Sequence, residues 1–161
     1  MKPSVKGGLA IGILCAVWTY IMGFTGWYRD PAMTSLFWVV VLIEVGVLIW
    51  ALRLVPEAQR SYGALLKQGV LMSLIGGIIV FFASLLFTTV FFPEYFAELQ
   101  AIEAEGLRAQ GMTAEQIEQM QAVTSMMQSP VPNAVLGFLG TFVTGTLASL
   151  LIAIFLRKKT P

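Results

Sequence analysis

Four continuous apolar stretches alternate with polar segments along this chain of 161 residues. They cover residues 7–27, 34–52, 69–92 and 135–156. Each is close to the roughly 20 residues that an α-helix needs to cross the hydrocarbon core of a bilayer. None shows the alternation of apolar and polar positions that is typical of barrel strands. The pattern predicts an all-α integral membrane protein, with residues 1–161 forming a single domain of four transmembrane helices.

The longest polar segment, residues 93–133, predicts a helical hairpin between the third and fourth spans. Thr113 and Gln116 have the spacing of a capping box, in which two side chains satisfy N–H groups at the start of a helix. An apolar stripe at helical spacing follows, formed by Ile117, Met120, Val123 and Met127. Two interpretations stay open: the two short helices pack on each other and on the membrane surface, or the stripe docks a partner helix.

Basic residues are distributed unequally over the polar segments. Only Arg29 and Arg108 flank one side of the predicted membrane. The other side has the remaining eight: Lys2, Lys6, Arg53, Arg60, Lys67, Arg157, Lys158 and Lys159. Cytoplasmic segments of membrane proteins carry an excess of Lys and Arg. The distribution therefore predicts that both termini are cytoplasmic and that residues 93–133 are extracytoplasmic.

Composition excludes several classes of function. A net charge of +1 offers no basic stripe for nucleic acid. The chain has no histidine, and its one cysteine, Cys15, cannot form a disulfide framework or a cysteine-based zinc site. Neither a Gly-rich phosphate loop nor a Gly-x-Ser-x-Gly motif is present. The acids of residues 93–133 lack calcium-type spacing and are interpreted as a solvated surface. We therefore expect no enzyme activity, no catalytic or metal site and no cofactor.

One acidic residue, Glu44, lies about midway through the second apolar stretch. A carboxyl group inside a membrane is costly, so such residues usually face protein or water and often carry function. Matching depth along the predicted helices points to Thr144 and Thr146 as its neighbours. In one interpretation Glu44 is protonated, bonds a threonine hydroxyl or a backbone carbonyl, and stabilises the bundle. In the other it binds a proton or cation, or pairs with a basic residue of a partner protein.

Small residues recur every four positions in three of the spans. Such faces let helix backbones approach closely in a bilayer, where lipid tails compete with apolar side chains. Packing within the four-helix bundle is one use of these faces, and formation of a homo-oligomer is the other. The residues concerned are Gly8 and Gly12, then Gly69, Ser73 and Gly77, then Gly137, Thr141, Gly145 and Ser149.

Several short segments carry a family resemblance over nearly the whole chain. They are Lys2-Pro-Ser-Val-Lys-Gly-Gly, residues 62–73, residues 111–118, Pro130 and the tail Arg157-Lys-Lys. In these segments the chain resembles a bacterial family catalogued as domain of unknown function 4199. The resemblance implies a small four-helix protein of the bacterial inner membrane. It implies no activity and no catalytic residues.

Two hypotheses for function follow. In the first, the chain is an accessory or scaffold protein that contacts a membrane-protein partner or a second copy through its helices. In the alternative, it is a small proton- or ion-coupled transporter, or a channel-forming oligomer, that uses Glu44. A water-filled path that reaches Glu44, or proton flux that Glu44→Gln abolishes, favours the second hypothesis. A solid bundle with Glu44 bonded to Thr144 or to a backbone carbonyl favours the first.

Overall fold

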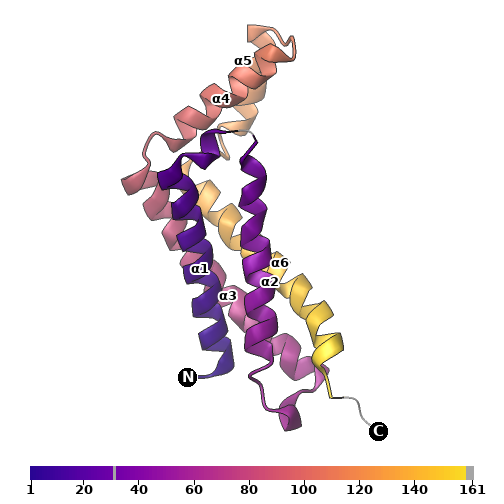
Figure 1. The fold of residues 1–161 in the computed structure, drawn as a ribbon. Helices are drawn as coiled ribbons and strands as arrows, with labels where there is room; N and C mark the ends of the chain where they lie inside the picture. Colours follow the sequence, from indigo (N-terminus) through magenta and orange to yellow (C-terminus); the bar gives the residue numbers. More distant parts are fainter. Residues whose placement is uncertain (31, 159–161) are drawn as a thin grey trace.

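A computed structural model describes residues 1–30 and 32–158, and they contain six α-helices and no strand (Figure 1). Lys159, one of the eight basic residues above, lies outside the described residues. The long helices are α1 (Pro3–Thr25), α2 (Val39–Leu52), α3 (Tyr62–Leu86) and α6 (Pro130–Leu156). The shorter ones are α4 (Tyr95–Ala109) and α5 (Ala114–Thr124). Single turns η1 (Trp27–Arg29), η2 (Thr34–Trp38), η3 (Glu57–Gln59) and η4 (Phe87–Phe91) join or extend them.

The prediction of an all-α fold with four membrane-length helices is confirmed. The segments long and apolar enough to span a bilayer are Pro3–Thr25, Ser35–Leu52, Tyr62–Phe91 and Pro130–Leu156. Three of them, those starting at Pro3, Tyr62 and Pro130, begin earlier than the apolar stretches of the sequence. The helix that contains the stretch from residue 69 already begins at Tyr62. Its start is capped by Ser61, whose hydroxyl accepts from the Ala64 N–H, so the polar residues before 69 are part of the helix. Pro130 begins α6 because proline suits the first turn of a helix.

The four long helices form a bundle in which each contacts two main neighbours. α3 packs against α1 and α6, and α2 packs against the same two helices from the other side. Figure 1 shows that α1 begins and α6 ends at one end of the bundle, called here the terminal end. The α4–α5 hairpin lies at the opposite end, called here the hairpin end. The apolar helices thus define a multi-pass membrane protein.

The packed core lies in the half of the bundle nearest the terminal end. Ile11 of α1, Leu48 of α2, Met72 of α3 and Ala153 of α6 are fully buried in one cluster. Close packing there depends on small residues: a Cβ atom on Gly7 would overlap the side chains of Met72 and Ala51. The four helices therefore meet tightly in this half.

The hairpin is built from local signals. The first helix of the pair is followed by Gly111, whose φ of +84° is a conformation that side chains other than glycine rarely adopt. The predicted capping box is confirmed, since Thr113 and Gln116 each bond the other's backbone N–H. α5 packs on α4 through Ile117, which is 3% exposed. The Gln121 side chain donates to the Gln100 carbonyl at 2.8 Å.

Candidate functional site

Glu44 is held inside the bundle by a residue of α6. Its side chain is 3% exposed, and its Oε2 lies 2.6 Å from the Thr144 hydroxyl. That hydroxyl also lies 2.8 Å from the Gly140 carbonyl oxygen, one turn earlier in α6. A hydroxyl has one proton but can accept as well as donate. Thr144 can therefore donate to a Glu44 carboxylate, or accept from a Glu44 carboxylic acid while donating to Gly140.

The second carboxyl oxygen of Glu44 has no hydrogen-bond partner among the described residues. It lies beside Gly145 and Ser73, and a Cβ atom on Gly145 would overlap both this oxygen and the Ser73 hydroxyl. The Ser73 hydroxyl itself donates to the Gly69 carbonyl at 3.0 Å. Gly145 thus makes the room that the carboxyl group occupies.

The structure places Thr146 apart from this arrangement. Its hydroxyl is buried and has no hydrogen-bond partner in the part of the chain that the structure describes. Of the two threonines matched to Glu44 by depth, the structure therefore joins only Thr144 to the carboxyl group. Residues two apart on a helix face different directions, and sequence depth could not distinguish them.

A cavity of about 480 Å³ begins at Glu44 and occupies the half of the bundle nearest the hairpin end. Cys15, Glu44 and Thr144 line its inner part, and Asn133 and Tyr95 line the part nearest the hairpin. All four long helices and the first turn of α4 contribute to its wall. The bundle therefore combines a cavity that reaches Glu44 with the Glu44–Thr144 hydrogen bond expected from the first hypothesis.

Aromatic side chains make up much of the cavity wall. They come from four different elements: Tyr20, Phe37, Trp38, Phe87 and Tyr95. Tyr20 packs edge-on against Phe87, with ring centroids 5.4 Å apart, and its hydroxyl donates to the Ala83 carbonyl. The elements that supply these rings lie far apart in the sequence, so the aromatic wall could not be predicted from spacing.

Two glycines of α6 contribute to the width of the cavity. Gly137 and Gly140 both line it. A Cβ atom on Gly140 would meet nothing within 4 Å, and one on Gly137 would only touch Val80 at 3.4 Å. Thr141 lies on the same wall. This part of the predicted small-residue face therefore borders a space and does not bring two helices into close contact.

The α1–α3 contact uses the small residues of α1. Gly8 lies against Ile75, and Gly12 lies against Ile79. A Cβ atom on either glycine would overlap the isoleucine side chain. Both glycines thus face a helix of the same chain.

The α3–α6 contact uses small residues from both helices. Gly69 lies against Ser149, and Gly77 lies against Phe138. A Cβ atom on Gly69 would overlap the Ser149 hydroxyl, which donates to the Gly145 carbonyl at 2.7 Å. These small residues allow the backbones of α3 and α6 to approach closely, as expected for helices in a bilayer.

A polar cluster joins the hairpin to the end of α1. The Tyr28 hydroxyl donates to Glu98 of α4, and the Arg29 guanidinium donates to both Glu98 oxygens at 2.8 and 2.9 Å. These bonds, first from Arg29 and then from Tyr28, lower the pKa of Glu98 below its ordinary value. Burial, together with Glu98, raises the pKa of Tyr28 to about 12. Tyr28 also packs on Tyr95, so the cluster positions a residue of the cavity wall.

The sequence interpretation missed this cluster. Arg29 lies in a short connection, and residues 93–133 carry six acids with no feature that distinguishes Glu98. The only available signal was complementary charge on the same side of the predicted membrane. Which acid pairs with Arg29 is decided by the angle at which α4 leaves the bundle.

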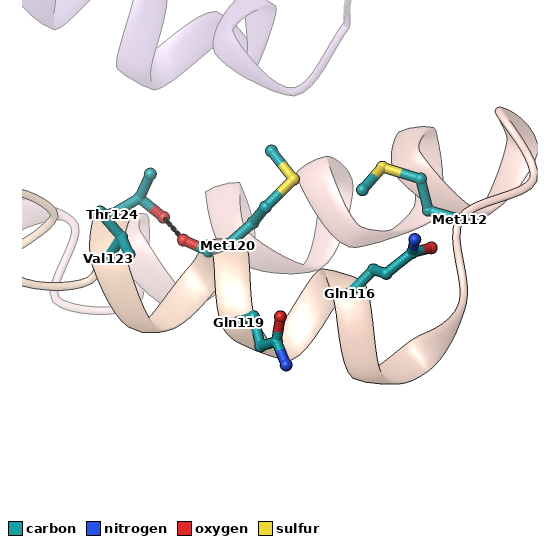
Figure 2. Close-up of a pocket in the computed structure, with 6 residues that line it drawn as sticks. All are labelled: Met112, Gln116, Gln119, Met120, Val123 and Thr124. Atoms are coloured by element: carbon teal, nitrogen blue, oxygen red, sulfur yellow. Dashed lines mark hydrogen bonds between the residues drawn. The ribbon is translucent and has the colours of Figure 1, made fainter.

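The apolar stripe of α5 continues beyond its contact with α4. Figure 2 shows a shallow pocket along this helix, with Met112 and Met120 directed to one side and Gln119 to another. Met120, Val123 and Met127 are 43%, 75% and 58% exposed. Packing on α4 therefore accounts for Ile117 and leaves the rest of the stripe uncovered by this chain.

Four apolar helices around a partly hollow centre define a small multi-pass membrane protein with an internal cavity. A family model described as "Protein of unknown function (DUF4199)" matches residues 6–158, and the chain belongs to this family. The resemblance found in the sequence is thus confirmed. No curated protein and no solved structure matches the chain.

Proposed function

We propose that this protein binds a small, largely apolar molecule within the membrane, in the cavity that ends at Glu44. The observation that carries the proposal is the cavity itself, about 480 Å³ in volume and lined mainly by apolar and aromatic side chains. Sites for small molecules are concave and mostly apolar, with a few polar groups that fix orientation. Glu44 and Thr144 are such groups at the inner end.

The residues at the rim of the cavity support entry of a ligand from the bilayer, through the side of the bundle. Phe37, Trp38 and Leu136 line the cavity and are also exposed, by 54%, 69% and 49%. They lie at the starts of the second span and of α6. An apolar molecule dissolved in the bilayer would reach the site between these two segments.

Binding is proposed in preference to catalysis because the chain offers little for proton transfer or covalent chemistry. It contains no histidine. Within residues 1–30 and 32–158 no group of three or more His, Cys, Asp or Glu side chains could hold a metal ion. The proposal is closest to the transporter alternative, because a binding site at an intramembrane acid is what a proton- or ion-coupled transporter requires.

A second candidate function is an accessory or scaffold role through helix–helix contacts with another membrane protein or a second copy. The observation that favours it is the exposed apolar stripe of α5, where Met120 and Val123 are 43% and 75% exposed. Exposed apolar patches often mark interaction surfaces. The two functions use different parts of the molecule and are compatible with each other.

We also propose that the protein lies in a bacterial inner membrane with the terminal end in the cytoplasm. The unequal distribution of Lys and Arg supports this orientation, with eight on one side of the spans and two on the other. The hairpin end, and with it the wider part of the cavity, would then face the extracytoplasmic side.

Trp38 provides a direct test of binding, because it lines the cavity. The full-length chain in lipid nanodiscs is titrated with 4-bromobenzyl alcohol, a neutral apolar molecule whose bromine quenches a tryptophan on contact. We expect a saturable quenching component that disappears in Trp38→Phe. It should also disappear in Gly140→Leu, where the new side chain fills open space on the cavity wall.

The matched control is Gly46→Leu. Gly46 also has no atoms within 4 Å of a Cβ position, but it is exposed and does not line the cavity. Its saturable quenching should equal that of the unmodified chain. Quenching that rises linearly in every variant, as partition into lipid would give, refutes the proposed binding function.

A further inference from the structure

We infer that the ligand of this cavity is an organic amine in its ammonium form, with a small apolar body and the charged nitrogen at Glu44. The inference rests on the binding function proposed above and specifies the chemical class of the ligand. Its basis is the combination of one buried acid, an aromatic wall and an excess of acids at the hairpin end.

Glu44 is the only formally charged side chain among the residues that line the cavity. No ion pair involves it within the described residues. Thr144 bonds one carboxyl oxygen, and the other oxygen has no hydrogen-bond partner among residues 1–30 and 32–158. An unpaired carboxylate in a low-dielectric interior is strongly destabilising, and a hydrogen-bonding cation offsets part of that cost. An ammonium group supplies both the charge and the N–H donors that this carboxyl group lacks.

The aromatic wall favours the same class of ligand. Tyr20, Phe37, Trp38, Phe87 and Tyr95 line the space between Glu44 and the hairpin end. The faces of such rings attract cations, most strongly organic ammonium groups that have lost their water. The edges and faces of the same rings also accommodate an apolar body. An anion would meet the Glu44 charge, with no basic residue in the lining to offset it.

An inorganic cation fits the cavity less well. Hard metal ions take six or more oxygen ligands, or keep much of their own water. Near Glu44 the lining offers the hydroxyls of Thr144 and Thr141, while Val40, Val41 and Val80 are apolar. An amine needs only two or three acceptors for its N–H groups, which this end of the cavity provides.

The charge around the hairpin end provides an independent argument. The segments at this end contain seven acids, Asp30, Glu94, Glu98, Glu103, Glu105, Glu115 and Glu118. They contain two basic residues, Arg29 and Arg108, and Arg29 is paired with Glu98. A surface whose charges are mostly of one sign raises the local concentration of ions of the opposite sign. The hairpin end therefore attracts cations toward the part of the bundle that holds the cavity.

The test compares two probes of the same shape. 4-Bromobenzylamine carries an ammonium group where 4-bromobenzyl alcohol has a hydroxyl. Both are titrated against the full-length chain in nanodiscs of neutral lipid, with quenching of Trp38 as the readout. We expect the amine to bind at least about tenfold more tightly than the alcohol, and Glu44→Gln to remove that difference.

The comparison in the unmodified chain needs no variant, so it stands even where Glu44→Gln does not fold. Equal affinities for amine and alcohol overturn the assignment of the ligand class and leave the binding function intact. A tighter amine that keeps its advantage in a folded Glu44→Gln chain also overturns it, since the nitrogen would then lie elsewhere. Saturable quenching by neither probe refutes the binding function, and the inference with it.

Discussion

The Thr144 hydroxyl is shared between the Glu44 carboxyl group and the Gly140 carbonyl oxygen. At the scale of single residues this explains how an acid is tolerated inside an apolar bundle. Reorientation of one hydroxyl proton lets Thr144 bond Oε2 of Glu44 in either protonation state, with no movement of heavy atoms.

Removal of the Thr144 hydroxyl should destabilise the bundle. Thr144→Val leaves Glu44 Oε2 buried without its partner, and we expect a loss of about 1 kcal/mol in the free energy of unfolding. The measurement is reversible unfolding in mixed micelles.

Thr146→Val serves as the matched control on the same helix. The Thr146 hydroxyl is buried without a hydrogen-bond partner among residues 1–30 and 32–158, so its replacement by a methyl group should leave stability unchanged or slightly raise it. Equal losses in the two variants would mean that the Glu44–Thr144 bond adds nothing to stability.

At the scale of elements, the orientation of α4 depends on its contacts with the end of α1. Glu98 receives donors from Tyr28 and Arg29, and Tyr28 packs on Tyr95 with ring centroids 5.0 Å apart. Since Tyr95 lines the cavity, these contacts connect the hairpin with the site. Elements held by a few exposed polar contacts open more readily than a packed core.

Neutralising Glu98 should loosen α4. The folded-state pKa of Glu98 is lowered, so its contribution to stability is complete above the ordinary value of 4.5 and is lost as the pH falls through the lowered value. We expect Glu98→Gln at neutral pH to reduce hydrogen-exchange protection of residues 95–109 by about two- to fivefold. This is the effect expected when the stabilisation from one exposed ion pair is lost. In the unmodified chain the same loosening should appear only in acid.

The control is Glu105→Gln, on the same helix. Glu105 is exposed and takes part in neither of the two ion pairs found among the described residues. Its exchange protection should match that of the unmodified chain at every pH. If the two variants behaved alike, net charge on α4 and not the Tyr28–Arg29–Glu98 cluster would determine how firmly the helix is attached.

At the scale of the whole molecule, the bundle is packed at one end and hollow at the other. The buried cluster of Ile11, Leu48 and Met72 fills the terminal half, while the cavity occupies the hairpin half. The packed half supplies the stability that allows the other half to stay open. The two candidate functions use different parts of the molecule, because the cavity lies within the bundle and the α5 stripe is exposed at the hairpin end.

The proposed orientation can be tested with a membrane-impermeant maleimide in a Cys15→Ala background. A cysteine introduced at Glu105 should react in spheroplasts, because the hairpin is expected outside. A cysteine at Glu57, in the connection between α2 and α3, should react only after permeabilisation. The reverse labelling pattern would invert the orientation, and reaction at both positions in sealed cells would contradict a crossing of the membrane by α3.

The sequence alone determined much of this protein. Apolar runs of membrane length specify four helices, because a chain in lipid must satisfy its backbone hydrogen bonds within each segment. Local chemistry also specified the capping box at Thr113 and Gln116 and the turn at Gly111. The isolation of Glu44 in an apolar helix singled out the residue on which the site depends.

Only the tertiary structure decided what surrounds Glu44. It selected Thr144 over Thr146, brought aromatic rings of four elements to one wall, and paired Glu98 with Arg29. It also divided the small residues of α6, with Gly145 in a tight contact and Gly140 beside a cavity. Periodicity shows which positions share a helix face. The angles at which helices cross decide whether that face meets a neighbour or a space, and those angles arise from all the contacts together.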